Sequence, residues 1–158
     1  MTRLPQPDLH NHYLSDYILL VAQSLQKLTG LHLADSTISP KAQAQQIYEA
    51  PYVLLTHNAT TDPIFQYANQ KGLALFELTW DELTTLHSKY SAEPQNREAR
   101  EKLLQEVALK GYTDHYSGVR ISKTGKRFEI RSAIVWNITD TQGTKIGQAA
   151  MFKDFHYL

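Results

Sequence analysis

The chain has 158 residues, enough for one domain that buries about two-thirds of the surface of its unfolded chain. Sixteen Lys and Arg residues balance sixteen Asp and Glu residues, so no net charge attracts nucleic acid or an anionic membrane, and we expect neither as a partner. The absence of cysteine excludes disulfides, thiolate metal ligands, a cysteine nucleophile and any chromophore attached through a thiol.

Residues 1–12 predict a loose arm, because they contain Pro5 and Pro7 and show no hydrophobic period. Their start lacks the apolar core of a signal peptide. No later segment approaches the roughly 18 consecutive apolar residues of a membrane span. We therefore expect a cytoplasmic protein.

An amphipathic helix is predicted over residues 13–28, followed by Gly30 as its stop and by a second short helix over residues 41–48. Its apolar residues recur at steps of three and four: Leu14, Tyr17, Ile18, Val21, Leu25 and Leu28. A stripe of this kind has to be covered by the rest of the domain or by another chain. From it we predict a homodimer.

The middle of the chain predicts short strands and helices. Strands are expected at residues 52–56 and 64–67, separated by a turn at residues 58–63. Asn69 is placed to cap a helix over residues 70–76, and Thr79 with Glu82 forms a capping box. Asn96 is expected to cap a longer helix over residues 97–110, which Gly111 ends.

The last third predicts three consecutive antiparallel strands. The turns are expected at Thr124-Gly125 and Gln142-Gly143, which supply the residues that tight hairpins need. In the middle strand, the alternation predicts that one face carries Phe128, Ile130, Ile134 and Trp136. The order of elements indicates a small sensor-type α+β domain rather than a catalytic fold.

Three segments resemble the MEKHLA domain in its bacterial, stand-alone form: HNATTDPIFQYANQKGLALFELTWDEL, SAEPQNREAREKLL and YSGVRISKTGKRFEIRSAIVWNITDTQGTKIGQAAMF. MEKHLA is a PAS-related family that also occurs at the C-terminus of plant class III homeodomain–leucine-zipper transcription factors. The resemblance covers residues 57–152. It implies a PAS-like five-stranded antiparallel sheet with helices over one face, in a domain at residues 51–158. Residues 1–50 would be an N-terminal arm and helices added to that domain.

The same resemblance implies a sensor or protein-interaction role. In PAS-type domains the cleft between sheet and helices can hold a small molecule or cofactor, and the outer sheet face often meets a protein partner. Family membership names no cofactor, so that identity stays open. The alternative within binding functions is a ligand-free adaptor whose cleft is filled by its own side chains.

Polar side chains at positions that the pattern buries are the candidates for such a cleft: His57, Ser91, Glu93, Arg97, Tyr116, Arg120, Trp136, Asn137 and Gln148. If a ligand binds, we expect it to contact Arg97, Tyr116, Arg120, Trp136 and Gln148, with His57 and Glu93 at the margin. Arginines beside aromatic rings suit a small carboxylate or a planar anion. The alternative is a salt bridge between Arg120 and Glu93 that closes the cleft.

One motif favours an enzyme instead. Asp8, His10 and His12 resemble the D-x-H-x-H opening of PHP-type metal-dependent phosphoesterases, and Asp154 with His156 resembles a later D-x-H. However, no apolar strand precedes the first motif, and a β/α barrel needs about 200 residues or more. We therefore predict no catalytic residues, no bound metal and no enzymatic activity.

Overall fold

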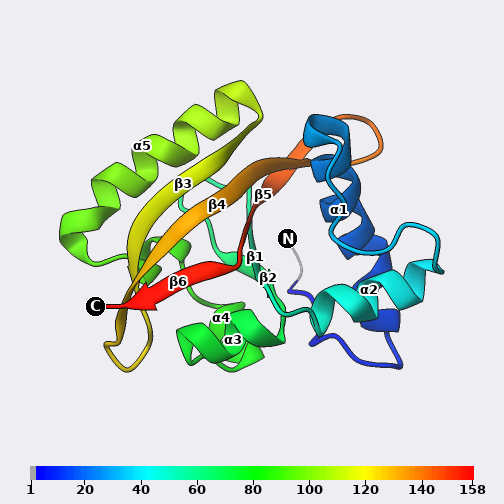
Figure 1. Ribbon diagram of the computed structural model, residues 1–158, viewed down its shortest axis with the longest axis horizontal. Coiled ribbons are helices and arrows are strands. Elements are labelled where there is room, and N and C mark those ends of the chain that lie inside the picture. The colour runs from blue at the N-terminus through cyan, green and yellow to red at the C-terminus, as the bar shows by residue number, and fades with distance from the viewer. Residues whose placement is uncertain (1–2) are drawn as a thin grey trace.

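The computed structural model describes residues 3–158, which form a six-stranded antiparallel sheet flanked by helices (Figure 1). The strands are β1 (Val53–Asn58), β2 (Phe65–Ala68), β3 (Tyr112–Ile121), β4 (Arg127–Thr139), β5 (Lys145–Phe152) and β6 (Asp154–Tyr157). The helices are η1 (His12–Leu14), α1 (Ser15–Thr29), α2 (Pro40–Tyr48), α3 (Gln70–Phe76), α4 (Trp80–Leu83), η2 (Ser88–Ser91) and α5 (Pro94–Lys110). The sheet order is β2-β1-β5-β4-β3, and β6 pairs with β4 in addition to the five strands predicted.

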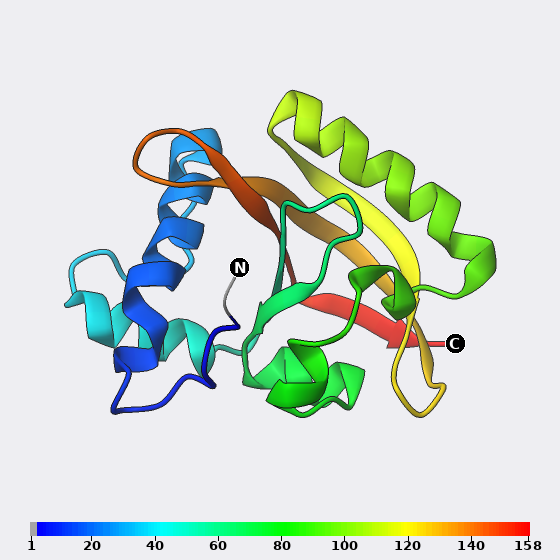
Figure 2. The same ribbon diagram turned by 180° about the vertical axis from the view of Figure 1, so that it is seen from behind.

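Helices cover the two faces of the sheet unequally (Figures 1 and 2). On the inner face, α3 packs against β1 and β2, and α5 packs against β3 and β4, while α4 packs against β2 with Trp80 in one hydrophobic cluster and Leu83 in the other. On the outer face, α1 packs against β4 and α2 packs against α1. The buried side chains form one hydrophobic cluster on each side of the sheet. No helix in residues 3–158 is long and apolar enough to cross a membrane.

The outward- and inward-facing positions of β4 change places in the middle of the strand. Ser132 adopts φ 52°, a left-handed conformation that interrupts the alternation of an extended chain. Before it, Phe128 and Ile130 belong to the inner cluster, but after it Trp136 belongs to the outer cluster. The prediction that Phe128, Ile130, Ile134 and Trp136 share one face is therefore wrong.

The apolar stripe of α1 is covered within the chain. Leu14, Ile18, Val21 and Leu25 are all buried in the outer cluster, and Gly30 ends the helix with φ 79°. The reason that led us to expect a homodimer is thus removed, although the homodimer itself stays a prediction.

The N-terminal arm is tied to α4 rather than loose. The Arg3 guanidinium donates to Thr84 Oγ1 and pairs with Asp81, and the Trp80 indole N–H donates to the Leu4 carbonyl at 2.9 Å. Residues 1 and 2 of the predicted arm lie outside the described residues.

Local capping signals account for most helix starts. The Asn69 side chain accepts from the Gly72 N–H, and Thr79 with Glu82 forms the predicted capping box. The prediction for α5 is wrong: the helix begins at Pro94, three residues before Arg97, with Glu93 rather than Asn96 at the cap position. Proline is favoured at a first helical position because its missing N–H has no helical partner there.

Candidate ligand cavity

A small cavity lies between the inner face of the sheet and α5, with η2 at one side. Its volume is about 70 Å³. Its apolar wall includes Leu55, Phe65, Phe76, Leu103, Leu104, Ile130, Val135 and Phe152. Its polar lining comprises Thr56, His57, Ser88, Ser91, Arg100, Tyr116, Arg120 and Gln148.

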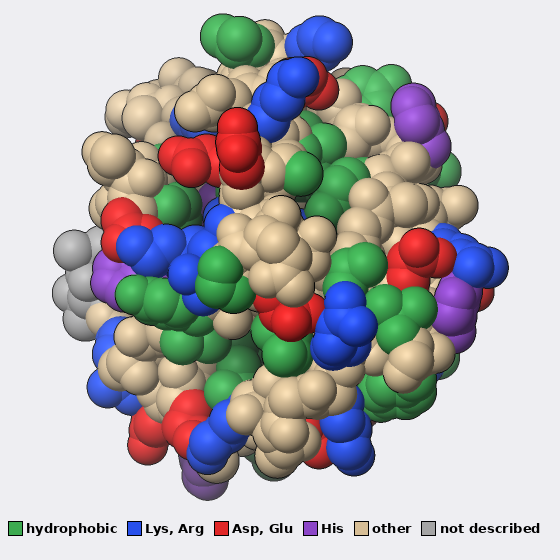
Figure 3. Space-filling view, turned by 90° about the vertical axis from the view of Figure 1, so that its left-hand side faces the viewer, with side chains coloured by type: hydrophobic (Ala, Val, Ile, Leu, Met, Phe, Trp, Pro, Cys, Tyr) green, Lys and Arg blue, Asp and Glu red, His purple; other side chains and the backbone are tan. Residues whose placement is uncertain are grey.

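The cavity adjoins an open groove of about 720 Å³ on the side of the Asn58 turn and α5. His57, Arg100, Leu104 and Gln148 line both spaces and therefore form the boundary between them. Figure 3 shows the side of the molecule that carries α5, where basic and acidic side chains are interspersed around hydrophobic ones. A molecule entering from the groove would meet this boundary first.

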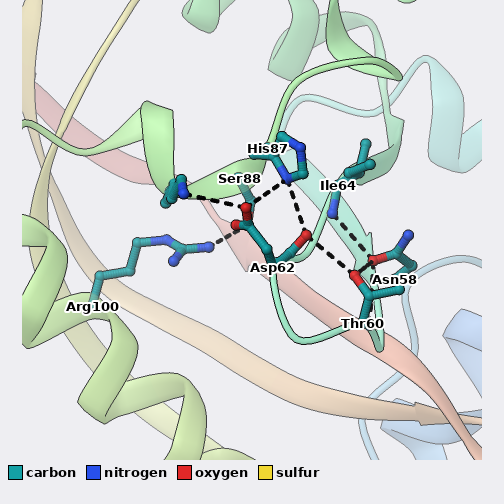
Figure 4. Close-up of polar contacts among 8 residues, drawn as sticks. Asn58, Thr60, Asp62, Ile64, His87, Ser88 and Arg100 are labelled. Atoms are coloured by element: carbon teal, nitrogen blue, oxygen red, sulfur yellow. Dashed lines mark hydrogen bonds and ion pairs between the residues drawn. The ribbon is translucent and has the colours of Figure 1, made fainter.

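Arg100 is held in the cavity wall by a polar network (Figure 4). It is only 7% exposed, and its Nη2 donates to the hydroxyl of Ser88. No ion pair of Arg100 occurs among residues 3–158. Burial, together with repulsion from Arg120, lowers its pKa to about 10, so the guanidinium remains charged at neutral pH.

The position of Ser88 is fixed by the turn between β1 and β2. The Asn58 side-chain oxygen accepts from the Thr60 hydroxyl at 2.8 Å and from the Ile64 N–H at 3.1 Å, which closes the turn. Asp62 at its tip lies beside His87, with 3.2 Å between Oδ2 and Nδ1 (Figure 4). Its Oδ2 also lies 3.2 Å from Lys89 Nζ, so its two partners flank Ser88 in the sequence. The turn thus positions the residue that orients Arg100.

Arg120 forms the second charge of the cavity. It is 8% exposed, and its donors reach the Val119 carbonyl at 2.8 Å and the Tyr116 hydroxyl at 2.7 Å. Its guanidinium also lies 5.5 Å from the centre of the Tyr116 ring. Like Arg100, it makes no ion pair within the part of the chain that the structure describes. Two buried cations therefore line one small space without a carboxylate in its lining.

Gly118 leaves the space that the contact between Tyr116 and Arg120 occupies. A Cβ atom at this position would lie 2.1 Å from the Tyr116 hydroxyl and 3.4 Å from Arg120 Nη1. A side chain here would displace the Tyr116 ring, so the absence of a Cβ at residue 118 is a requirement of the cavity wall.

His57 carries an unpaired ring nitrogen. Its Nδ1 lies 2.8 Å from the Asn58 carbonyl, whereas its Nε2 is out of contact with solvent and has no hydrogen-bond partner among residues 3–158. Burial lowers the pKa of His57 to about 4, and Arg100 and Lys145 add repulsion, so the ring is neutral at pH 7.

The predicted salt bridge between Glu93 and Arg120 is not formed. Glu93 instead pairs with Arg127 at 2.5 Å, because β4 brings that guanidinium to the start of α5. Arg97 lies in the groove, where its Nε donates to the Ala92 carbonyl and its guanidinium stacks 5.0 Å from the Tyr90 ring centre.

Trp136 lies on the opposite side of the sheet from the cavity. Its indole N–H donates to the Val21 carbonyl of α1 at 3.1 Å, and its side chain is fully buried in the outer cluster. The structure thus places Trp136 outside the cavity in which it was expected, and the reason is the change of facing at Ser132.

Gln148 and Asn137 tie the sheet to α5. The Gln148 amide donates to the Leu104 carbonyl and to Asn137 Oδ1, at 3.0 and 3.1 Å. The Asn137 amide in turn donates to the Val107 carbonyl at 3.0 Å. Ser91, another candidate, donates to the Ser88 carbonyl at 2.7 Å. Protein groups thus satisfy much of the predicted polar set.

The sequence analysis missed three polar residues of the cavity lining, Thr56, Ser88 and Arg100, of which Arg100 carries the charge. A signal for it exists, because Arg100, Leu103, Leu104 and Val107 recur at steps of three and four on α5 and are the residues of its inner side. A charged residue within such a stripe indicates a buried polar function rather than a solvated one.

Asp8 and His156, two residues of the proposed metal motifs, make local contacts. Asp8 and Asn11 exchange hydrogen bonds with each other's backbone N–H, at 2.9 and 3.0 Å. His156 on β6 contacts Arg131 at 2.9 Å and Glu129 at 3.6 Å. Within residues 3–158, no group of three or more His, Asp or Glu side chains is arranged to hold a metal ion.

The sheet order and the helices over its inner face define a PAS-type fold. The chain superimposes on a PAS domain from Colwellia psychrerythraea with a TM-score of 0.60 at 12% identity, covering 75% of this chain and 95% of that one. It also superimposes on the light-oxygen-voltage domain of the photoreceptor aureochrome1, with a TM-score of 0.55 at 15% identity over 75% of this chain and 84% of that one. The predicted α+β fold is confirmed.

The chain belongs to the MEKHLA domain family, whose model matches residues 15–157, so the resemblance found in the sequence is confirmed. The match includes α1 and α2; the division at residue 50 stays a prediction. The homeobox-leucine zipper protein HOX29 of Oryza sativa is 24% identical over 109 residues, 69% of this chain and 13% of that protein. ATHB-14 of Arabidopsis thaliana is 24% identical over 142 residues, 87% of this chain and 17% of that protein. The chain thus spans less than a fifth of these relatives.

Proposed function

We propose that this domain is a sensor that binds a small organic carboxylate in the cavity between sheet and α5. The observation that carries the proposal is the pair of buried arginines, Arg100 and Arg120, which face one cavity and form no ion pair within residues 3–158. Tyr116, Gln148 and His57 complete the polar lining.

The energetic argument rests on the cost of burying charge. Removing a charged side chain from water costs several kcal/mol, and this cost is offset only where a counter-charge and hydrogen bonds are supplied. The serine, tyrosine and carbonyl partners of the two guanidiniums supply hydrogen bonds but no negative charge. A carboxylate would supply both, because its oxygens accept from guanidinium donors in a bidentate geometry.

The size of the cavity limits the ligand. A volume of about 70 Å³ holds a few water molecules or an acid of a few non-hydrogen atoms. One structural neighbour, with a TM-score of 0.58, is a light-oxygen-voltage domain studied with a flavin analogue. Sites for molecules of that size span roughly 300–1,000 Å³. The cavity does not fit a flavin, and we propose none.

The test is a thermal-shift and calorimetric screen of short mono- and dicarboxylic acids. A binding acid should raise the melting temperature of the wild type, and Arg100→Gln and Arg120→Gln should each abolish that rise. Arg131→Gln is the matched control, since Arg131 is an exposed arginine that pairs with Glu129 away from the cavity. If no acid stabilises the protein, or if the rise survives in both cavity variants, the proposal is refuted. The ligand-free adaptor would then be favoured.

The output of the sensor is proposed to be a change in contact with a protein partner, in the cytoplasm, without catalysis by the domain itself. The simplest such partner is a second copy of this chain, which would form a homodimer. Sedimentation or light scattering with and without the acid would test it, and a monomer under both conditions would point to another protein.

A further inference from the structure

The hydrogen-bonding state of His57 can be assigned from its neighbours. A carbonyl oxygen only accepts hydrogen bonds, so the contact of Nδ1 with the Asn58 carbonyl at 2.8 Å places the ring proton on Nδ1. In the neutral ring, Nε2 is then a bare acceptor. It is shielded from solvent, and no group within residues 3–158 donates to it.

None of the nearby donors reaches His57 Nε2. Gln148, which pairs with His57 across β1 and β5, uses its amide protons on Leu104 and Asn137. Arg100 donates one of its five N–H groups to Ser88, and none of the others donates to His57 Nε2. A buried acceptor without a partner costs roughly 1–3 kcal/mol, comparable to a lost hydrogen bond. His57 also lines the cavity into which the two arginines face.

We infer that the ligand of this cavity is a short 2-hydroxy acid, whose carboxylate binds the arginines and whose hydroxyl donates to His57 Nε2. The inference rests on the proposed function and specifies its ligand. The donor has to be uncharged, because an ammonium group would lie beside Arg100 and Arg120 of the cavity lining and near Lys145 of the adjoining groove. A 2-oxo acid presents an acceptor to the Nε2 lone pair, and the corresponding simple acid presents only a methylene.

The test compares lactate, propionate and pyruvate, which have the same carbon chain and differ at carbon 2. In the wild type, lactate should bind roughly two- to tenfold more tightly than propionate, the range expected for one neutral hydrogen bond. Pyruvate should bind no more tightly than propionate. In His57→Phe, which keeps a ring but has no acceptor, the three dissociation constants should converge to within about twofold. His57→Asn is the second variant, since its amide can keep the bond to the Asn58 carbonyl but does not reach the position of Nε2.

The outcomes separate the two proposals. If none of the acids binds, or if binding is unaffected by Arg100→Gln and Arg120→Gln, the proposed function itself fails. If all three acids bind the wild type equally, or if the lactate preference persists in both His57 variants, a carboxylate site remains but this inference is overturned.

If His57→Phe and His57→Asn both fail to fold, NMR spectroscopy of the wild type provides the test. In long-range ¹⁵N–¹H spectra, Nε2 of His57 should shift on addition of lactate and not on addition of propionate. An Nε2 resonance that responds identically to both acids would overturn the assignment.

Discussion

The neutral state of His57, which is half-buried, predicts a specific dependence of stability on pH. The pKa of a histidine is 6.5 in an unfolded chain, and in the folded protein that of His57 is about 4. Between these values the unfolded state binds a proton that the folded state does not, so the free energy of unfolding falls as the pH falls. From pH 7 to pH 5 the loss from His57 alone is about 2 kcal/mol, and over the whole interval it is about 3 kcal/mol.

Urea denaturation at pH 7, 6 and 5 measures this loss, with His57→Asn as the reference that lacks a titrating ring. The wild type should lose about 2 kcal/mol more than the variant over this range. Carboxylates with lowered pKa values contribute outside this window. Glu77, for example, is held at a pKa of about 2 by hydrogen bonds from Thr124 and Ser122, and its contribution is lost only below about pH 4.5. Parallel stability profiles for wild type and variant, or an NMR titration of His57 with a midpoint near 6.5, would refute the reasoning.

Four substitutions test other parts of the structure. Asn69→Ala removes a fully buried side chain that bonds to four backbone groups, and chemical denaturation should show a loss of about 3 kcal/mol or a failure to fold. Trp136→Phe should cost about 1 kcal/mol in the same assay, and calorimetry should find acid binding unchanged to within about twofold, because Trp136 lies across the sheet from the cavity. Gly118→Ala should weaken acid binding about tenfold by displacing Tyr116, and unchanged affinity would contradict the role given to this contact. Arg100→Met should leave the melting temperature of the ligand-free protein unchanged or higher, while the acid-induced rise disappears.

The parts of the fold that sequence predicts well are those that depend on neighbouring residues. A cap such as Asn69 or a capping box such as Thr79 with Glu82 acts within one helical turn, so its signal survives without knowledge of the tertiary structure. Gly30 ends α1 for the same local reason. The prediction that Asn96 caps α5 failed because Pro94, two residues earlier, is itself favoured at a helix start.

The parts that failed depend on contacts between distant segments. The facing of Trp136 follows from one left-handed residue, Ser132, in the middle of β4, and no glycine or proline marks that position. The partner of Glu93 follows from how far β4 extends toward α5, which places Arg127 there instead of Arg120. Sequence alternation alone provides neither piece of information.

We expect a ligand in the cavity to affect the packing of α5 on the sheet more than that of any other element. Val107 and Arg100 are the buried side chains of α5, so this helix rests on the sheet through few apolar contacts and several polar ones. The polar ones include the bonds from Gln148 and Asn137 to its carbonyl groups. Segments with few buried apolar contacts open at low free-energy cost. A carboxylate that neutralises Arg100 from within the cavity would therefore stabilise the contact of α5 with the sheet, since repulsion between Arg100 and Arg120 opposes that contact without an anion.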